Sequence, residues 1–500
     1  MPSITKIILK ISIAIAFLAV RIWAEQPYRQ LFFDDQRLYI RENLERVYGN
    51  PELAGVYQDT TLAVEYGWVW ALDGQDGKVH LVYLGEHKNS HQLITAAAIS
   101  YDGVNFEPRN TAVEAGLPVP QVANQLLPNP PNGEIGSVLM DPIAPESERY
   151  KLFFCDFATL DQGHVLNYLW TSPDLIHWTK MDNSCWQPIG TEPMVGAFYN
   201  PVFKNYTILS RPDWGQRRVA RTETADWHAY TPLVHCLQTD ALDPVLAEIY
   251  GMPAFHYHGW FVGFPHIFYD VPQVRNLKFA GGRMRCEIAY SLNGLNWQRT
   301  LRQAFLDGEN PQLQDVMGGR ANMVFLTSMR EDDDGSILLY GSGTLNEHGA
   351  SDAGCVPERS KILIYRLRRD GFIGLKTVDD SRPATIASRG IVCIGKDLSI
   401  NLQAEHATCA VYAWTWSASP EPLPGYSHEE CVPFSGDNAE WHPAWKEHQN
   451  LSGLEKRLLV IEIKLQNGII YSFSIEGIPQ MEIECNRYLG NATPTERPGF

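Results

Sequence analysis

Five acidic residues each stand shortly before an apolar stretch with the pattern of a strand. They are Glu65, Glu134, Glu192, Glu248 and Asp315. Equivalent positions on repeated strands would place these carboxyl groups around one axis, where mutual repulsion raises their pKa values. A protonated carboxyl beside an ionised one is the arrangement that acid–base catalysis requires. The alternative is that several are ordinary solvated loop acids, which are common in a chain of net charge −17.

A second set of polar residues follows the strands that come next along the chain. Its members are Asp156, Arg211, Asp213, Trp214, His266 and His348. Arginine, histidine and tryptophan side chains suit the binding of hydroxyl groups or a carboxylate and the stacking of a sugar ring. We expect Glu248 and Asp315 to join this binding set. For the densest stretch, residues 211–218, a charged hairpin loop is the alternative interpretation.

The elements that must position these residues recur along the chain. Three stretches share a Ser-x-Asp/Asn pattern followed by an aromatic residue: Ser100–Phe106, Ser172–Trp178 and Ser291–Trp297. Thr222–Trp227 and Arg369–Phe372 are degenerate copies. The copies are about 50–80 residues apart, enough for a four-stranded sheet each. The acidic or amide residue favours a tight turn and the aromatic residue packs between sheets, so this repeat is structural.

Two apolar strands joined by a polar turn precede the repeat, for example residues 136–140 and 150–154. The sequence therefore predicts an all-β protein in which residues 25–380 form a five-bladed β-propeller. The inner strand of each blade begins at one end, here called the mouth, and runs away from it. The five carboxylates and the second polar set then meet at the mouth. Asp141 follows its strand and is expected at the opposite end, as a turn former.

The two ends of the chain are expected to be separate from the propeller. Residues 1–24 combine lysines, an apolar run and Ala24 before a polar stretch, which is typical of a secretory signal peptide. An uncleaved anchor is the alternative. A different β-rich pattern covers residues 381–484 and predicts a C-terminal β-sandwich, followed by a polar tail over residues 485–500. The mature protein is then secreted or periplasmic.

Composition and missing motifs exclude several classes of function. The 500 residues include 41 Lys and Arg against 58 Asp and Glu, a balance that disfavours nucleic acids and anionic membrane surfaces as partners. The nine cysteines contain no Cys-x-x-Cys pair, and the sequence has no nucleophile elbow, phosphate-binding loop or His-Glu-x-x-His motif. We therefore expect no metal and no cofactor. The sequence does not indicate an oligomeric state.

Four phrases carry a family resemblance: Leu31–Asp35, Glu248–Pro253, Ser291–Trp297 and Glu347–Gly349. With the repeats, the chain resembles five-bladed β-propeller glycosidases related to glycoside hydrolase families 32, 43 and 68, in a branch of exported bacterial proteins with a C-terminal β-sandwich. In the characterised families, three acidic residues from the first three blades act as nucleophile or base, as acid and as modulating group. The invertase-type motifs Trp-x-Asn-Asp-Pro-Asn-Gly and Arg-Asp-Pro do not occur here.

The resemblance implies an exported glycoside hydrolase that acts on a plant or algal glycan. It makes Glu192 the general acid, Glu65 the base or nucleophile and Glu134 the modulating group. Two other interpretations remain open. One is a non-catalytic glycan-binding propeller, and the other is a polysaccharide lyase in which Arg211 neutralises a uronate and His266 or His348 is the base.

Overall fold

The fold was determined as a computed structural model that describes residues 27–64, 68–128, 133–157, 166–181, 192–212, 214–270, 282–348, 359–414 and 421–480. The expected signal peptide and C-terminal tail lie outside the described residues. Strands make up 54 % of the described residues and helices 4 %, which confirms the all-β class. The chain divides into two compact units: unit 1 contains residues up to Gly49 together with those from Arg369 onward, and unit 2 spans Asn50–Arg368.

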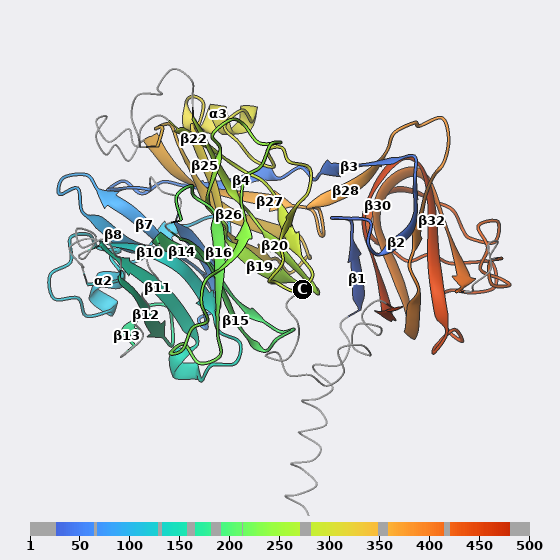
Figure 1. The fold of residues 1–500 in the computed structure, drawn as a ribbon, viewed down its shortest axis with the longest axis horizontal. Helices are drawn as coiled ribbons and strands as arrows, with labels where there is room; N and C mark the ends of the chain where they lie inside the picture. The colour runs from blue at the N-terminus through green and yellow to red at the C-terminus, as the bar shows by residue number, and fades with distance from the viewer. Residues whose placement is uncertain are drawn as a thin grey trace, which may run out of the picture. The chain divides into compact units, whose positions relative to one another are not determined.

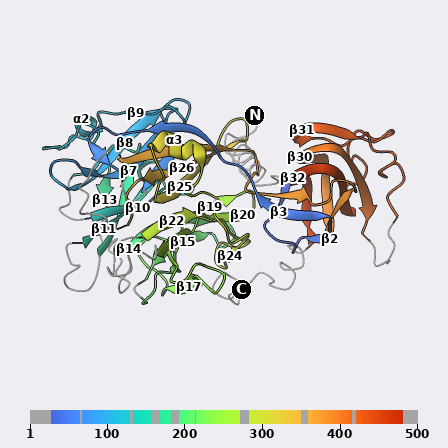
Figure 2. The ribbon, with the colours of Figure 1, turned by 90° about the horizontal axis from the view of Figure 1, so that it is seen from above.

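The described residues of unit 2 form five β-sheets, which Figure 2 shows following one another around the unit. The first contains β5 (Leu62–Ala63), β6 (Val69–Asp73), β7 (Val79–His87), β8 (Leu93–Ser100) and β9 (Glu107–Pro108). The second contains β10 (Gly133–Met140), β11 (Tyr150–Asp156), β12 (Leu166–Ser172) and β13 (Thr179–Lys180). The third contains β14 (Glu192–Asn200), β15 (Asn205–Arg211), β16 (Val219–Thr224) and β17 (Val234–Leu237).

The fourth sheet contains β19 (Ala254–Tyr257), β20 (Trp260–Gly263), β23 (Ala289–Ser291) and β24 (Gln298–Arg299). The fifth contains β18 (Glu248–Gly251), β21 (His266–Asp270), β22 (Gly282–Cys286), β25 (Met323–Glu331), β26 (Ile337–Thr344), β27 (Ser360–Leu367) and β4 (Glu52–Tyr57). Backbone pairing thus gives five sheets in unit 2, whereas the propeller-like arrangement of the described residues has four blades (Figure 1). β4 comes first in this unit yet pairs with β27 near its end, so the two ends of unit 2 share one sheet.

Side-chain hydroxyl groups connect the inner strands of neighbouring sheets. Thr327 on β25 exchanges hydrogen bonds with the backbone of Val69 on β6, at 3.2 and 2.5 Å. Ser328 does the same with Ala71, at 3.0 and 3.2 Å. Ser137 on β10 likewise accepts a hydrogen bond from the backbone N–H of Ala197 on β14, at 3.1 Å. These hydroxyls satisfy buried backbone groups where no strand lies close enough to pair.

Four of the predicted repeat copies form the same turn. In each, the carboxyl or amide oxygen of one Asp or Asn accepts the backbone N–H groups two and three positions later, at 2.8–3.0 Å. These residues are Asp102, Asp174, Asp226 and Asn293. The residue after each has a positive φ of 64–73°, although two of them, Leu175 and Trp227, are not glycine. The side-chain acceptor therefore stabilises a backbone conformation that L-residues rarely adopt.

The aromatic residues of the repeat pack against a neighbouring sheet, as expected. Phe106 of the first sheet lies edge-on to Tyr340 of the fifth, with ring centroids 6.2 Å apart. Trp297 of the fourth sheet lies 6.4 Å from Phe198 of the third. Such contacts bury large apolar surfaces between sheets that share few backbone hydrogen bonds.

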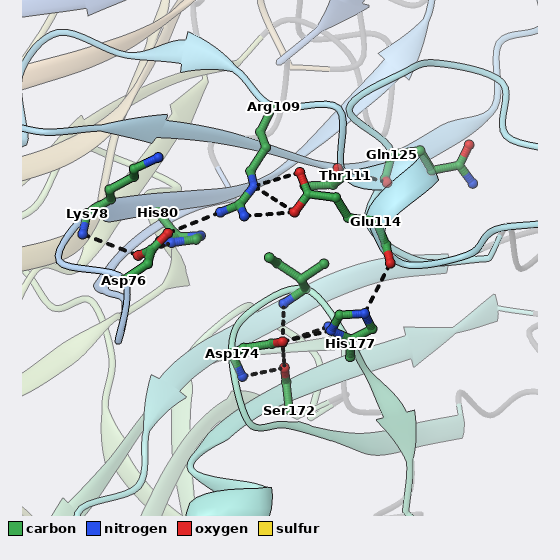
Figure 3. A network of polar contacts seen from close by, with 11 residues as sticks. Asp76, Lys78, His80, Arg109, Thr111, Glu114, Gln125, Ser172, Asp174 and His177 are labelled. Carbon is green, nitrogen blue, oxygen red and sulfur yellow. Dashed lines mark hydrogen bonds and ion pairs between the residues drawn. The ribbon is translucent and has the colours of Figure 1, made fainter.

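A polar network connects the first two sheets next to one of these turns (Figure 3). Arg109 donates to both carboxylate oxygens of Glu114, at 2.7–3.1 Å, and to Asp76 at 3.3 Å. His177, which contacts Asp174 at 2.7 Å, donates to the backbone carbonyl of Glu114 at 3.0 Å. Burial lowers the pKa of His80, while its neighbour Asp76 opposes that shift. Because these groups satisfy one another, we assign the network a structural role.

The fifth predicted repeat copy, Arg369–Phe372, is not a blade turn. It belongs to unit 1, where the Asp370 carboxylate accepts a hydrogen bond from Ser472 at 2.5 Å and pairs with Arg29 at 3.0 Å. An Asp-Gly pair favours a turn in any β-protein, so the dipeptide alone did not identify the sheet.

Unit 1 contains eight described strands in one hydrogen-bonded sheet. They are β1 (Tyr28–Leu31), β2 (Leu38–Glu42), β3 (Leu44–Tyr48), β28 (Ile373–Thr377), β29 (Ala384–Ser388), β30 (Ile391–Ala413), β31 (Phe434–Trp441) and β32 (Leu458–Pro479). The long strands β30 and β32 pair along most of their length.

The N-terminal strands correct the expected boundary of the propeller at residue 25. β1 pairs with β32, β2 with β29 and β3 with β28, all in unit 1. The partners of these strands lie more than 300 residues away in sequence. A local pattern does not specify so distant a partner.

Helices are short in the described part of the chain. α2 spans Thr111–Glu114 and α3 spans Pro311–Met317. The Asn310 side chain caps α3 by accepting the N–H groups of Gln312 and Leu313, and Gly318 ends it with a left-handed φ of 72°. Neither described helix has the length and hydropathy needed to cross a membrane.

The repeat turn provides a stability test with an internal control. In Asp102→Ala, the N–H groups of Val104 and Asn105 lose their acceptor, and we expect the free energy of unfolding to fall by about 1–2 kcal/mol. Asp102→Asn keeps an acceptor oxygen, as Asn293 does in the fourth sheet, and should lose less. Chemical denaturation followed by tryptophan fluorescence measures both; equal losses would contradict the assigned role of the oxygen.

Candidate functional site

Tyr250, on β18, is the centre of the aromatic contacts at the mouth. Its side chain is buried, with 8 % exposure. The ring stacks on Trp68, which precedes β6, at a centroid distance of 6.3 Å and an interplanar angle of 18°. Phe268 and Phe325 lie 6.5 and 6.3 Å from it. Residues from three separate stretches of the chain therefore surround one phenol.

Two arginines lie over the Tyr250 ring. The guanidinium carbon of Arg211, at the end of β15, is 4.6 Å from the ring centroid, and that of Arg217 is 5.7 Å from it. Arg217 also pairs with Glu248, with 2.5 Å between Nη1 and Oε2, and its backbone N–H donates to the same carboxylate at 3.2 Å. Glu248 thus holds Arg217 over the ring face, where cation–π attraction stabilises the charge.

Glu134, at the start of β10, contributes negative charge to this group. Its Oε2 accepts a hydrogen bond from Trp68 Nε1 at 3.1 Å. Burial raises the pKa of Tyr250, and the Glu134 carboxylate raises it further, whereas Arg211 and Arg217 oppose the shift. The Tyr250 hydroxyl consequently stays protonated at neutral pH.

His348 is a further member of the group around Tyr250. Its Nε2 lies 3.3 Å from the Tyr250 hydroxyl, and its ring is edge-on to both Tyr250 and Phe268 at 5.2 Å. Its backbone N–H donates to the carbonyl of Gly282 at 2.9 Å, which fixes it beside β22. A histidine, a phenol and a guanidinium in contact form a chain of groups able to bind an anion and move a proton.

The structure thus brings together four of the predicted site residues: Glu134, Arg211, Glu248 and His348. Glu134 and Glu248 lie at the starts of their strands and Arg211 lies at the end of one. All three are therefore at the end of the sheets that we defined as the mouth. Sequence reasoning missed Tyr250, Trp68 and Phe268, and it included Arg217 only as part of the stretch 211–218. Tyr250 follows Glu248 by two residues on β18, but a register shift between Ile249 and Gly251 interrupts the strand alternation there, so alternation in the sequence did not predict its orientation.

The remaining predicted residues have various positions. Glu65 and Asp213 lie outside the described residues. Glu192 begins β14, with its backbone opposite Arg211 in the strand register. Asp156 ends β11, opposite Gly133 and next to the partner of Glu134. Trp214 is 43 % exposed in the loop after β15, and Asp315 is exposed on α3.

His266 does not join the site, which corrects its predicted role in binding. Its side chain is fully buried, and its Nε2 donates to the backbone carbonyl of Leu326 at 2.8 Å. Burial lowers the pKa of His266 to about 4. The His266 side chain points into the core. Alternation along a strand gives two faces but does not say which one is buried, so the sequence did not predict this orientation.

Asp141 lies at the far end of β10 from Glu134, as expected. Its carboxylate accepts hydrogen bonds from the hydroxyl of Tyr206 at 2.7 Å and from Trp227 Nε1 at 3.3 Å. It also accepts the backbone N–H groups of Ile143 and Ala144 at 3.2 Å. The Asp141 side chain is 1 % exposed and contacts residues of the third sheet, so it connects the second and third sheets.

Comparison with known proteins gives structural likenesses only. No protein-family model and no curated protein matches this chain. A thermostable family-43 glycoside hydrolase aligns with a TM-score of 0.42 and 11 % identity, over 65 % of this chain and 95 % of that one. A glycosyl hydrolase from Bacteroides ovatus aligns at 0.40 and 14 %, over 65 % and 96 %. An N-acetylgalactosamine deacetylase from F. plautii, in complex with blood group B trisaccharide, aligns at 0.40 and 12 %, over 65 % and 95 %. At these values the likenesses assign no activity to this chain.

No group of three or more His, Cys, Asp or Glu side chains with the geometry of a metal site occurs among the described residues. The side chains around Tyr250 are carboxylates, guanidinium groups, a phenol and an imidazole.

The buried His266 predicts a specific pH dependence of stability. Its pKa is about 4 in the folded protein and close to 6.5 when unfolded, so the unfolded state binds the extra proton between these values. Stability is full above pH 6.5 and falls as the pH drops toward 4, by on the order of 3 kcal/mol for this one group.

His266→Gln keeps a donor for Leu326 but does not titrate. The difference in unfolding free energy between wild type and this variant should therefore shrink as the pH falls from 7 to 4, in chemical denaturation at several pH values. A difference that stays constant over this range would show that His266 does not titrate as inferred.

Proposed function

We propose that this chain is an exported glycoside hydrolase that cleaves a plant or algal oligo- or polysaccharide by carboxylate acid–base chemistry at the mouth of a five-bladed propeller. The observation that carries the proposal is the convergence of Glu134, Glu248, Arg211 and His348 on Tyr250. Glycoside cleavage requires a proton donor for the leaving oxygen and a carboxylate beside the developing positive carbon. It also requires groups that hold sugar hydroxyls, which this site contains.

The five-bladed ring is supported by the connection between the first and last sheets. Thr327 and Ser328 of the fifth sheet hydrogen-bond to the inner strand of the first, and Phe106 packs on Tyr340 across the same boundary. We infer that β25, β26, β27 and β4 are the fifth blade and that the long strands of unit 1 form a β-sandwich. The signal-peptide pattern of residues 1–24 supports export.

We assign different chemical roles to the predicted carboxylates. Glu192, opposite Arg211 in register, is assigned as the general acid and Glu65 as the base or nucleophile. Glu134 is assigned as the modulating group, because it is held by Trp68 and influences the pKa of Tyr250 through its charge. Glu248 is paired with Arg217, so it positions a substrate-binding cation and is poorly suited to proton transfer.

Assay of a panel of plant and algal oligosaccharides with wild type and Glu192→Gln tests the proposal. Removing the acid should lower turnover by on the order of 100-fold or more for unactivated leaving groups, and less for activated aryl glycosides. Glu107→Gln is a matched control, because this glutamate is exposed on β9. An unchanged rate would remove Glu192 from the mechanism, and saturable binding without product would make the chain a glycan-binding protein.

The contact of His348 with Tyr250 beside Arg211 favours one second candidate, a polysaccharide lyase. Arg211 would neutralise a uronate carboxylate, and His348 would remove the acidified proton while the bond to the leaving glycosidic oxygen breaks. Uronate polymers should then give a product with the ultraviolet absorbance of an unsaturated sugar, and His348→Ala should abolish it. Absence of that absorbance alongside reducing-sugar release would exclude the lyase and retain the hydrolase.

A further inference from the structure

Unit 1 contains a cavity of about 80 Å³ that has no part in the mouth. It is lined by Arg29 on β1, Ser399 and Asn401 on β30, Ser474 on β32, and the segment Arg369–Asp370. The strand register explains this polar group, because Ser474 is opposite both Arg29 and Ser399. Residues two apart on a strand share a face, so Ser399 and Asn401 extend the same row.

The charges of the cavity are already paired with one another. Asp370 is 2 % exposed, pairs with Arg29 at 3.0 Å and accepts from Ser472 at 2.5 Å. Arg369 pairs with Glu440 at 3.2 Å, and the Glu440 side chain is 56 % exposed at the edge. The two guanidinium groups and two carboxylates sum to zero, so neither an anion nor a cation gains a net attraction.

The segment that carries the charges is fixed in place. Asn401 Nδ2 donates to the backbone carbonyl of Arg369 at 2.5 Å. Asp370 has a φ of 56°, a left-handed conformation that its buried side-chain contacts hold in place. The cavity walls are consequently positioned before any ligand arrives, which reduces the ordering cost of binding.

We propose that this cavity binds one ring of a neutral sugar. Hydroxyl groups both donate and accept hydrogen bonds, so a sugar ring satisfies carboxylates, guanidinium groups and serine hydroxyls together. At roughly 10–15 Å³ for each water, the cavity holds about five to eight water molecules, which suits a single ring better than a chain. The residues that line the cavity belong to unit 1, so we expect sugar binding there to be independent of binding or catalysis at the mouth.

Titration calorimetry of the full chain with D-glucose, D-galactose, D-mannose and L-arabinose tests the proposal, with D-glucuronate and D-glucosamine as charged counterparts. At least one neutral sugar should bind saturably. Ser399→Leu fills the cavity without removing a charge and should weaken that binding at least tenfold. Gln403→Leu, at an exposed position on the same strand, is the matched control and should bind as wild type does.

Two further variants keep the result interpretable. Arg369→Gln removes a charged donor without adding volume, and it should also weaken binding if Ser399→Leu proves unstable in thermal unfolding. Arg211→Ala disables the mouth and should leave this binding unchanged. The proposal is overturned if no neutral sugar binds, or if binding is lost in Arg211→Ala but kept in Ser399→Leu. It is also overturned if D-glucuronate binds more tightly than every neutral sugar and Ser399→Leu weakens that binding.

Discussion

The contact between inner strands of neighbouring sheets is the constraint on which unit 2 depends. These strands belong to different sheets, so their buried backbone groups cannot all pair as in one ladder. Thr327, Ser328 and Ser137 resolve this by placing hydroxyls against the backbone of the next inner strand. Each such hydroxyl costs little side-chain entropy and avoids an unsatisfied buried amide, which is worth about 1–3 kcal/mol. Close inner strands then bring the starts of several strands to one place.

That proximity creates the electrostatic problem at the mouth. Carboxylates at equivalent strand positions would repel one another, and desolvation would increase the cost. The protein balances them with Arg211 and Arg217, which lie against the face of Tyr250, and with the indole N–H of Trp68. Aromatic faces allow guanidinium groups to be partly buried while remaining charged. The result is a mixed site in which carboxylates, cations and a protonated phenol coexist within contact distance.

Unit 1 uses a different solution to a similar problem. Its cavity contains Asp370 almost fully buried, and Arg29 compensates the charge from an N-terminal strand. The strands at the two ends of the chain are hydrogen-bonded to each other, so residues more than 300 positions apart build one polar surface. Loss of either partner would leave a buried charge unpaired. The ion pair between Arg29 and Asp370 therefore stabilises the attachment of β1 to this sheet in addition to the backbone hydrogen bonds.

The sequence by itself determined features that contiguous residues encode. The Ser-x-Asp turns, the all-β class and the placement of Glu134, Glu248, Arg211 and His348 at one end of their strands follow from local hydrogen bonding and alternation, which act over a few residues. Only the tertiary structure decided that Tyr250 is the point where these groups meet, that His266 turns inward, and that Asp370 belongs with Arg29 instead of a fifth blade turn. Those outcomes depend on which strand pairs with which and on which face is buried. Both are set by packing between residues far apart in the chain, and many distant partners fit the same alternating pattern equally well.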